Sequence, residues 1–493
     1  MELKIKFLKW SAGLPVAMLN KETAKEIGVH AKDRVCINTI PKSSKQISII
    51  VDIVEDLVKE KEIAVSSEVK EIMNINSGKM VDVNLTETPK SLVFIKKKLD
   101  KKILSEEEIK EIIKDIVNDS LSEPEIALFV SAMYEQGMNF KETIFLIKAI
   151  LNSGETLKLN NKYIVDKHSI GGIPGNRTTP IVVSICASTG LIMPKNSSRA
   201  ITSAAGTADV IETIAKVDFS SNELEKILKK TNACLVWGGS WKMVPADSKI
   251  INVERVLNID PEAQLLASIM SKKLAVNSKY ILIDIPYGKH AKVCKKKALI
   301  LKKKFEKIGK YFKKDLKCVL TNGSQPIGNG IGPALELIDT IKVLDPNQKG
   351  PEDLEKKSLY LSGLIFEMTG KSKRGEGVNL AKEILTSGKA FEKFKEIIKA
   401  QDGSIKKLKK MKFKIDVFSK KSGKIYKIHN KKINSLARIA GCPVDKYSGL
   451  YLYYHLGDKV KKGQKIITIY SESRLRLKEA IKFYNSRNPI KIR

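Results

Sequence analysis

The chain has 493 residues, 42% of them hydrophobic, and a formal net charge of +34 at pH 7. This length is too great for one hydrophobic core and predicts about three or four domains in a multidomain α/β protein. No apolar run reaches the ~18–20 residues of a membrane span, and the first residues lack the apolar stretch of a signal peptide, so we expect a cytoplasmic protein.

The positive charge comes mainly from lysines on predicted helix faces, such as 295–297, 302–304 and 406–414. A basic RNA-binding or scaffold protein would carry such a charge. Few aromatic residues lie between the lysines for base stacking, so we favour a lysine-rich solvated surface that attracts small anionic substrates.

The six cysteines are scattered and have no metal-ligand spacing. We expect them to be buried, inert thiols, although the sequence leaves a disulfide open. No metal and no cofactor are expected.

Residues 1–84 alternate apolar and polar residues in short runs at 3–8, 35–40, 47–54 and 80–85, which predicts strands. Between the first two runs, the segment 19–35 predicts a helix that stops at Gly28 and leads into a strand. This part of the chain contains no candidate site residue, and we expect it to serve assembly into a homodimer or higher oligomer.

Residues 85–160 predict an all-α lobe with apolar positions at helical spacing. Ser105 with Glu108, and Ser122 with the acidic residues that follow it, predict capping boxes at two helix starts. Helical patterns between about 222 and 275, at 223–230 and 262–274, are expected to join this lobe.

Residues 161–408 alternate strand and helix patterns, which is typical of a mixed or largely parallel sheet. Two polar loops stand out. The first follows a strand expected to end near Val165, and the second follows a strand near 191–194 and opens a helix at about Ala204. Because each loop lies between a strand end and a helix start, backbone N–H groups there can bind an anion. A third strand, glycine-rich loop and helix occupy 318–336, and residues 409–493 predict an α+β subdomain.

The two loops read DKHS-x-GG with a following PGN-R-T turn, and SSRAITSAAGTAD. They resemble the thymidine and pyrimidine-nucleoside phosphorylase family, most closely its archaeal branch, over essentially the whole chain. The resemblance implies a type II nucleoside phosphorylase fold, preceded by a small double-psi-like β-barrel that ordinary nucleoside phosphorylases lack.

Phosphorolysis of an N-glycosidic bond requires that phosphate be held against C1′, that the ribose be held as positive charge builds on it, and that the leaving base receive a proton. The phosphate candidates are Lys167, Ser169, Gly171, Thr179 and Ser197. The nucleotide-binding candidates that the resemblance implies are Gly172, Ser198, Arg199, Ala200, Ile201, Thr202, Ser203, Thr207, Ser268 and Lys292.

Asp260 is the candidate general acid, since the position that it matches protonates the leaving base in the archaeal branch. Asp260-Pro261 also fits a helix start, so a pure N-cap role stays open. Lys272, one turn after Ser268, is a further candidate, as are His168 and, less clearly, Arg255.

The resemblance implies phosphorolysis of AMP to adenine and ribose 1,5-bisphosphate, with CMP and UMP as further substrates. Lys167, Arg177, Arg199, Lys272 and Lys292 provide five cations for a monophosphate and inorganic phosphate, which together bring roughly three to four negative charges. The alternatives are a pyrimidine-nucleoside phosphorylase that makes no use of a 5′-phosphate and, from another class, a basic RNA-binding or scaffold protein.

Overall fold

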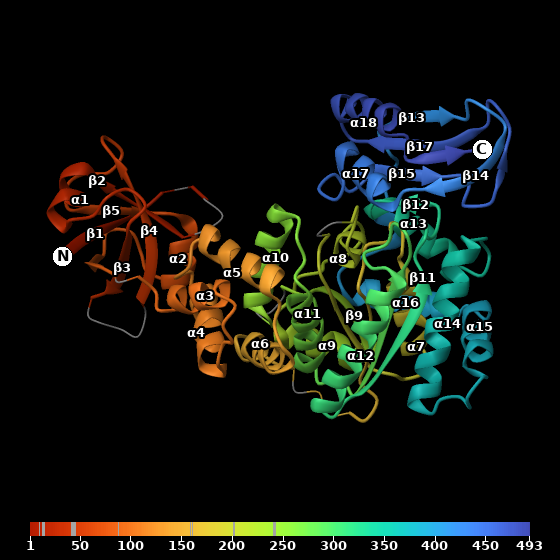
Figure 1. Ribbon diagram of the computed structural model, residues 1–493, viewed down its shortest axis with the longest axis horizontal. Coiled ribbons are helices and arrows are strands. Elements are labelled where there is room, and N and C mark those ends of the chain that lie inside the picture. The colour runs from red at the N-terminus through yellow and green to blue at the C-terminus, as the bar shows by residue number, and fades with distance from the viewer. Residues whose placement is uncertain are drawn as a thin grey trace. The chain divides into compact units, whose positions relative to one another are not determined.

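The structure is a computed structural model and describes residues 1–8, 10–11, 15–40, 46–86, 88–157, 159, 161–200, 203–239 and 243–493. The chain divides into two compact units (Figure 1). Unit 1 comprises Met1–Ser153 and Pro245–Ala267, and unit 2 comprises Gly154–Val244 and Ser268–Arg493.

Unit 1 begins with a closed β-barrel of strand order β1-β5-β2-β4-β3-β6. Its strands are Glu2–Phe7 (β1), Val16–Asn20 (β2), Arg34–Thr39 (β3), Gln46–Val54 (β4), Glu62–Val65 (β5) and Met80–Leu85 (β6), and its helices are Lys21–Ile27 (α1) and Ser67–Met73 (α2). The barrel is closed because β6 pairs with both β3 and β1. Apolar side chains from every strand fill its core.

The barrel confirms the predicted N-terminal β-domain and the helix that ends at Gly28, which has a φ of 79°. The predicted runs missed β2 and β5. Neither strand alternates buried and exposed positions, because three successive residues of β5 and the first two of β2 are buried.

Helices of an all-α lobe follow the barrel. They are Ser91–Leu99 (α3), Glu106–Val117 (α4), Glu123–Gln136 (α5) and Phe140–Asn152 (α6), and Pro245–Leu257 (α10) packs on α4, α5 and α6. The predicted capping boxes of Ser105 and Ser122 are present.

Unit 2 contains a parallel sheet of order β11-β10-β7 and a parallel pair β8-β9, with an isolated parallel bridge from Ile164 to Ile192 between them. The strands are Val165–Ser169 (β7), Met193–Ser197 (β8), Ala233–Trp237 (β9), Tyr280–Tyr287 (β10) and Asp315–Asn322 (β11). This arrangement confirms the predicted largely parallel α/β core.

Helices surround these strands, and apolar side chains of strands and helices form a shared core. The helices are Thr178–Ala187 (α7), Thr207–Ile211 (α8), Ser221–Thr231 (α9), Glu262–Ala275 (α11), Lys295–Tyr311 (α12), Pro333–Leu344 (α13), Glu352–Thr369 (α14), Gly377–Thr386 (α15) and Lys389–Ala400 (α16). Contrary to expectation, α9 does not join the α lobe, because it packs on α16 and β9 of unit 2. Only the first part of α11 belongs to unit 1.

The C-terminal part of unit 2 is the predicted α+β subdomain, blue in Figure 1. Its elements are Phe413–Phe418 (β13), Gly423–Ile428 (β14), Asn430–Ala440 (α17), Gly449–Leu452 (β15), Lys459–Val460 (β16), Lys465–Ser471 (β17), Arg474–Arg487 (α18) and Ile490–Ile492 (β18), preceded by a 3-10 turn at Ile405–Lys407. The short strand Gly330–Ile331 (β12) pairs with β15, so the α/β core and the subdomain share one sheet.

Across the described residues all six cysteines are free thiols. Four are buried as expected, but Cys36 is only half-buried and Cys294 is exposed. None of the described helices is both long and apolar enough to cross a membrane.

Candidate anion and nucleotide site

The first predicted loop begins after Ser169, later than the prediction that placed its start near Val165. Strand β7 begins at Val165 instead of ending there, so Lys167, His168 and Ser169 belong to the strand. A polar run of this kind suggests a loop, but β7 lies beside β10, whose apolar residues supply the neighbouring core. The loop proper is the segment 170–177, between β7 and α7.

Lys167 is 1% exposed, and its Nζ donates hydrogen bonds to the Thr178 hydroxyl at 2.7 Å and the Thr179 hydroxyl at 3.4 Å. Both threonines belong to the first turn of α7. Burial lowers the pKa of Lys167 to about 7, against the opposing attraction of the Asp284 carboxylate. The phosphate candidates Lys167 and Thr179 therefore meet at a helix N-terminus, where an anion is favoured.

Ser169 ends β7, and its hydroxyl accepts long hydrogen bonds of 3.4 Å from the Gly171 N–H and the Asn176 side chain. Gly171 and Gly172 follow with φ values of 82° and 88°. A Cβ on Gly172 would lie 2.9 Å from the Lys292 Cβ, so only glycine lets this backbone approach the loop that follows β10. Lys292 in turn donates to the Ile170 carbonyl at 3.4 Å.

The second predicted loop lies between β8 and α8, and α8 begins at Thr207 instead of near Ala204. Asp209 closes this loop from within α8, because its Oδ2 accepts hydrogen bonds from the backbone N–H of Ala200 at 2.7 Å and of Gly206 at 2.8 Å. The Ser203 hydroxyl donates to the Ala205 carbonyl at 3.0 Å. Two further candidates in this loop, Ile201 and Thr202, lie outside the described residues.

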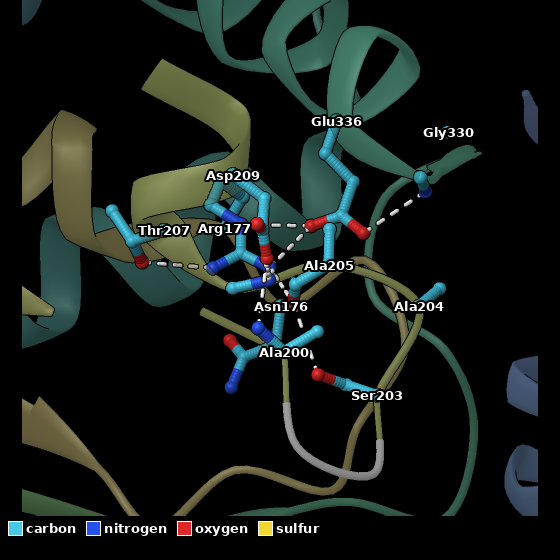
Figure 2. A network of polar contacts seen from close by, with 12 residues as sticks. Asn176, Arg177, Ala200, Ser203, Ala204, Ala205, Thr207, Asp209, Gly330 and Glu336 are labelled. Atoms are coloured by element: carbon cyan, nitrogen blue, oxygen red, sulfur yellow. Dashed lines mark hydrogen bonds and ion pairs between the residues drawn. The ribbon is translucent and has the colours of Figure 1, made fainter. Parts of the chain in front are cut away.

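Arg177 joins the two loops (Figure 2). Its guanidinium donates to the Thr207 hydroxyl at 2.8 Å, to the Ala205 carbonyl at 2.8 Å and to Glu336 at 2.7 Å. The expectation that Arg177 serves as a cation for the substrate stays a prediction, and the structure adds that its guanidinium has partners within the protein. The buried carboxylate of Glu336 already balances its charge, and its donors hold the loops together.

Arg199 is also paired with carboxylates. It makes two hydrogen bonds to Glu212, at 2.5 and 2.6 Å, and its guanidinium lies 5.2 Å from the Trp237 ring centroid. Lys446 of the C-terminal subdomain lies 2.6 Å from the same Glu212. Two of the five expected cations thus have carboxylate partners within the protein.

Ser197, Ser268 and Lys272 form a second group of candidates. The Ser197 carbonyl accepts from the Gly238 N–H at 2.8 Å. A Cβ on Gly238 would lie 3.3 Å from the Lys272 Cε, so Lys272 extends along the backbone that follows β9. The Lys272 Nζ donates to the Ser268 hydroxyl at 2.9 Å. The structure therefore places the predicted Ser268–Lys272 pair on one helix face beside the ends of β8 and β9.

Buried charges that the sequence analysis missed lie behind these groups. Asp166 accepts from Lys195 at 3.0 Å and from Lys273 at 2.9 Å, and all three side chains are buried. Burial lowers the pKa of Lys273 well below its usual value, although the Asp166 carboxylate acts against this shift. Burial and the neighbouring lysines hold the pKa of His168 well below its usual value, so this candidate is a neutral imidazole at neutral pH.

A second buried carboxylate, Asp284 on β10, accepts from Thr321 at 2.6 Å and pairs with Lys357 at 2.9 Å. In the sequence, Asp284 shows only as an acidic residue inside an apolar strand. Asp166 lies in a polar run, where an acidic residue is not conspicuous. No sequence pattern marked Asp209 or Glu336. Asp209 binds backbone N–H groups, and Glu336 binds Arg177, which is far away in the chain.

Asp260 and Arg255 belong to unit 1. Asp260 is half-buried and directly precedes Pro261, whose carbonyl accepts from the Leu265 N–H in the first turn of α11 at 2.9 Å. Arg255 is exposed on α10 and donates to the Asn252 side chain at 3.2 Å. Because α11 begins at Glu262 and its first hydrogen bond is accepted by Pro261, Asp260 lies one residue before the N-cap position that the sequence predicted for it.

The arrangement in unit 2 suits an anionic ligand. Two strand-end loops, linked by Arg177, present backbone N–H groups and hydroxyls, and lysines lie behind or beside them. Such preorganised donors can bind phosphate oxygens without large rearrangement. We therefore interpret the ends of β7, β8, β9 and β10 as the candidate site.

Comparisons with known proteins show which families and folds this chain is similar to. Residues 93–154 match the glycosyl transferase family helical bundle domain, 161–391 the glycosyl transferase family a/b domain, and 424–491 the pyrimidine nucleoside phosphorylase C-terminal domain. The fold is similar to that of anthranilate phosphoribosyltransferase from Thermus thermophilus, with a TM-score of 0.52, 17% identity, and coverage of 63% of this chain and 99% of that one.

Curated relatives are similar over nearly their whole length. The AMP phosphorylase of Thermococcus kodakarensis is 42% identical, covering 100% of this chain and 98% of its own. That of Methanocaldococcus jannaschii is 41% identical, covering 97% and 95%, and that of Methanococcus aeolicus is 40% identical, covering 99% and 97%.

Proposed function

This chain belongs to the AMP phosphorylase family, and we propose that it catalyses the phosphorolysis of AMP to adenine and ribose 1,5-bisphosphate. The observation that carries the proposal is the pair of strand-end loops that Arg177 links. They combine backbone donors with buried lysines, which suits a site for two phosphate groups.

In this reaction a phosphate oxygen forms a bond to C1′ of the ribose, and the bond from C1′ to the base nitrogen breaks. We assign inorganic phosphate to the first loop, with Lys167, Ser169 and the Gly171 backbone, supported by Thr179 and Ser197. Ammonium, hydroxyl and backbone N–H groups all donate hydrogen bonds to phosphate oxygens. The work of these groups is to position phosphate and to neutralise its charge.

We assign AMP to the second loop and to the segments that follow β9 and β10. Gly172, Ser268 and Lys292 would bind the nucleotide, together with the loop residues Ser198, Arg199, Ala200, Ile201, Thr202, Ser203 and Thr207. Lys272 lies 2.9 Å from Ser268 and would share its ligand. In this assignment Arg199 contributes donors that Glu212 orients.

The base leaves with the electron pair of the glycosidic bond and needs a proton on the nitrogen that receives it. We propose that the Asp260 carboxyl group gives that proton, as a general acid. A proton donor at the start of α11 and a ligand group at Ser268 would then share one helix.

A pyrimidine-nucleoside phosphorylase is the second candidate, because residues 424–491 match the C-terminal domain of that enzyme class. The similarity to AMP phosphorylases over nearly the whole chain favours the monophosphate. CMP and UMP are further proposed substrates. We also propose that the N-terminal barrel mediates assembly into a homo-oligomer.

An assay of base release tests the proposal. It compares AMP, adenosine, CMP, UMP and uridine, each with and without phosphate. We expect release from AMP to exceed release from adenosine by at least about 30-fold in kcat/KM, since a lost buried charge pairing costs ~2–4 kcal/mol. Faster release from uridine than from any monophosphate would favour the second candidate.

A further inference from the structure

Helix α17 of the C-terminal subdomain contacts the site through its first turns. Its start at Asn430 follows directly on His429, and Asn434 lies one turn further along the same helix. These three residues contact three different loops of the α/β core, which follow β10, β11 and β8. No other role described above uses them.

His429 stacks on His290, which lies in the loop after β10, two residues before Lys292. The ring centroids are 3.9 Å apart and the ring planes differ by 18°. Burial lowers the pKa of His290 to about 4, with a further contribution from His429, and burial also lowers the pKa of His429. Both rings are therefore neutral at neutral pH and stack without charge repulsion. The His429 side chain makes no capping hydrogen bond to α17.

Asn430 is fully buried, and its side-chain N–H donates to the Gly323 carbonyl at 2.9 Å, in the loop after β11. Gly323 packs closely against the loop 170–177 and the loop that follows β10. A Cβ at this glycine would lie 2.8 Å from the Ile173 side chain and 3.2 Å from the Ala291 Cβ. The contact therefore extends to the first loop and to the residue before Lys292.

Asn434 is 5% exposed, and its Oδ1 accepts the backbone N–H of Ala204 at 3.1 Å. Ala204 is buried in the second loop, between Ser203 and the Ala205 carbonyl that Arg177 binds. Asn434 thus supplies the acceptor for a buried backbone donor, which would be unfavourable without a partner.

We propose that His429, Asn430 and Asn434 are positioning residues, through which the C-terminal subdomain holds the Lys292 loop and the 198–206 loop in the geometry that binds the nucleotide. In this proposal α17 contributes no ligand group of its own, and it fixes where two loops of the core lie. This inference rests on the proposed function, because it assigns both loops to AMP.

The test compares two substitutions with their conservative counterparts. His429→Ala removes the stacked ring and His429→Phe keeps one, whereas Asn434→Leu removes the acceptor and Asn434→Asp keeps an oxygen in its place. Ser435→Ala is the control, since Ser435 is exposed on the same helix and its hydroxyl bonds only its own helix, at the Lys431 carbonyl. KM for AMP, KM for phosphate, kcat and the melting temperature are measured for each variant.

We expect His429→Ala and Asn434→Leu each to raise KM for AMP by about tenfold, the effect of one lost hydrogen bond or a misplaced ligand group. KM for phosphate should change less than about twofold in both. His429→Phe, Asn434→Asp and Ser435→Ala should keep wild-type values. Unchanged KM for AMP in both disruptive variants, or a rise that the conservative partners do not reverse, would overturn the proposal.

Hydrogen exchange separates this inference from the proposed function. In Asn434→Leu, the peptide covering 198–206 should exchange about tenfold faster than in the wild type, and in His429→Ala the peptide covering 286–294 should do so. If the wild type releases no base from AMP, the proposed function fails. If the two peptides exchange hydrogen at wild-type rates in both variants, the positioning role is refuted, whatever the enzyme assay shows.

Discussion

Lys167 shows how the surroundings of one residue change its chemistry. The sequence marks it only as a cation, but the structure buries it against the hydroxyls of Thr178 and Thr179, and burial lowers its pKa to about 7. Above that pH the free protein holds it neutral. A bound dianion favours the charged form, so anion binding and protonation of Lys167 are coupled.

Sulfate binding measures this coupling, because sulfate does not itself titrate near pH 7. We expect binding at pH 8.5 to take up close to one proton and binding at pH 5.5 to take up almost none. Calorimetry in two buffers with different ionisation enthalpies gives the number of protons. In Lys167→Arg the uptake should vanish, since a guanidinium stays charged throughout this range. Sulfate binding without proton uptake at pH 8.5 in the wild type would show that Lys167 does not face the anion.

The same residue sets a stability trend. The folded-state pKa lies below the ordinary value of 10.5. Burial of the charged lysine therefore costs stability below about pH 7, and this cost disappears as the pH rises from about 7 to 10.5, where the unfolded chain binds more protons. The difference in free energy of unfolding between the wild type and Lys167→Met should therefore shift in favour of the wild type across that window.

Asp260 separates a structural from a catalytic role. Asn has the size of Asp and can accept a hydrogen bond at the same place, so Asp260→Asn should be nearly silent if the residue has only a structural role before α11. If Asp260 is a general acid, the Asp260→Asn variant should lose ~10²–10⁴-fold in kcat for AMP, with the melting temperature and AMP affinity little changed. Steady-state kinetics decide between the two, and retention of more than about a third of kcat would leave only the structural role.

Sequence reasoning predicted the residue types of the site better than their partners. It selected Ser268 with Lys272 from helical spacing, and the structure joins them by a hydrogen bond. It assigned Arg177 to the substrate, whereas Arg177 binds Glu336, 159 positions away in the chain. Long-range ion pairs leave no local pattern, so the sequence could not show which cations are already balanced.

At the scale of elements, the second loop depends on Asp209. This carboxylate accepts the backbone N–H groups of Ala200 and Gly206 and so fixes both ends of the loop. The sequence predicted the strand, turn and helix, but it began α8 near Ala204 and ended β8 too early. The hydroxyl-rich segment 197–207 fits either a turn or the start of a helix. Its conformation is settled by the Asp209 carboxylate, which accepts backbone N–H groups at both ends, and local sequence does not show this.

Asp209→Ala leaves one buried donor and one half-buried donor without their acceptor, so we expect a loss of ~2–5 kcal/mol in the free energy of unfolding. Glu223→Ala is a matched control, because Glu223 accepts the Ser220 N–H in an exposed capping box on α9, which is worth ~1 kcal/mol. Urea denaturation of both variants gives the comparison. Equal losses would mean that Asp209 does no more than an ordinary helix cap.

At the scale of the whole chain, pattern predicted N-terminal strands, an α lobe, an α/β core and a C-terminal subdomain, and the family resemblance implied that the strands form a barrel. The folds of these parts are confirmed. The division at 84, 160 and 408 stays a prediction. The return of α9 to the α lobe was wrong, because an amphipathic helix pattern does not reveal which of two cores covers its apolar face.

The barrel has a core of its own and none of the predicted site residues. We expect deletion of residues 1–84 to leave a folded protein with fewer chains per particle than the full-length form. Light scattering coupled to size-exclusion chromatography measures this number. The same number of chains in both forms would end the assembly role.

The central claim is that this chain transfers the ribose 5-phosphate group of AMP from adenine to inorganic phosphate. The most direct measurement follows AMP, adenine and the sugar phosphate together by phosphorus NMR and chromatography, with and without phosphate. We predict that adenine and ribose 1,5-bisphosphate appear in equal amounts and only when phosphate is present. Adenine release that continues without phosphate and yields ribose 5-phosphate, or no release at all from AMP, would contradict the claim.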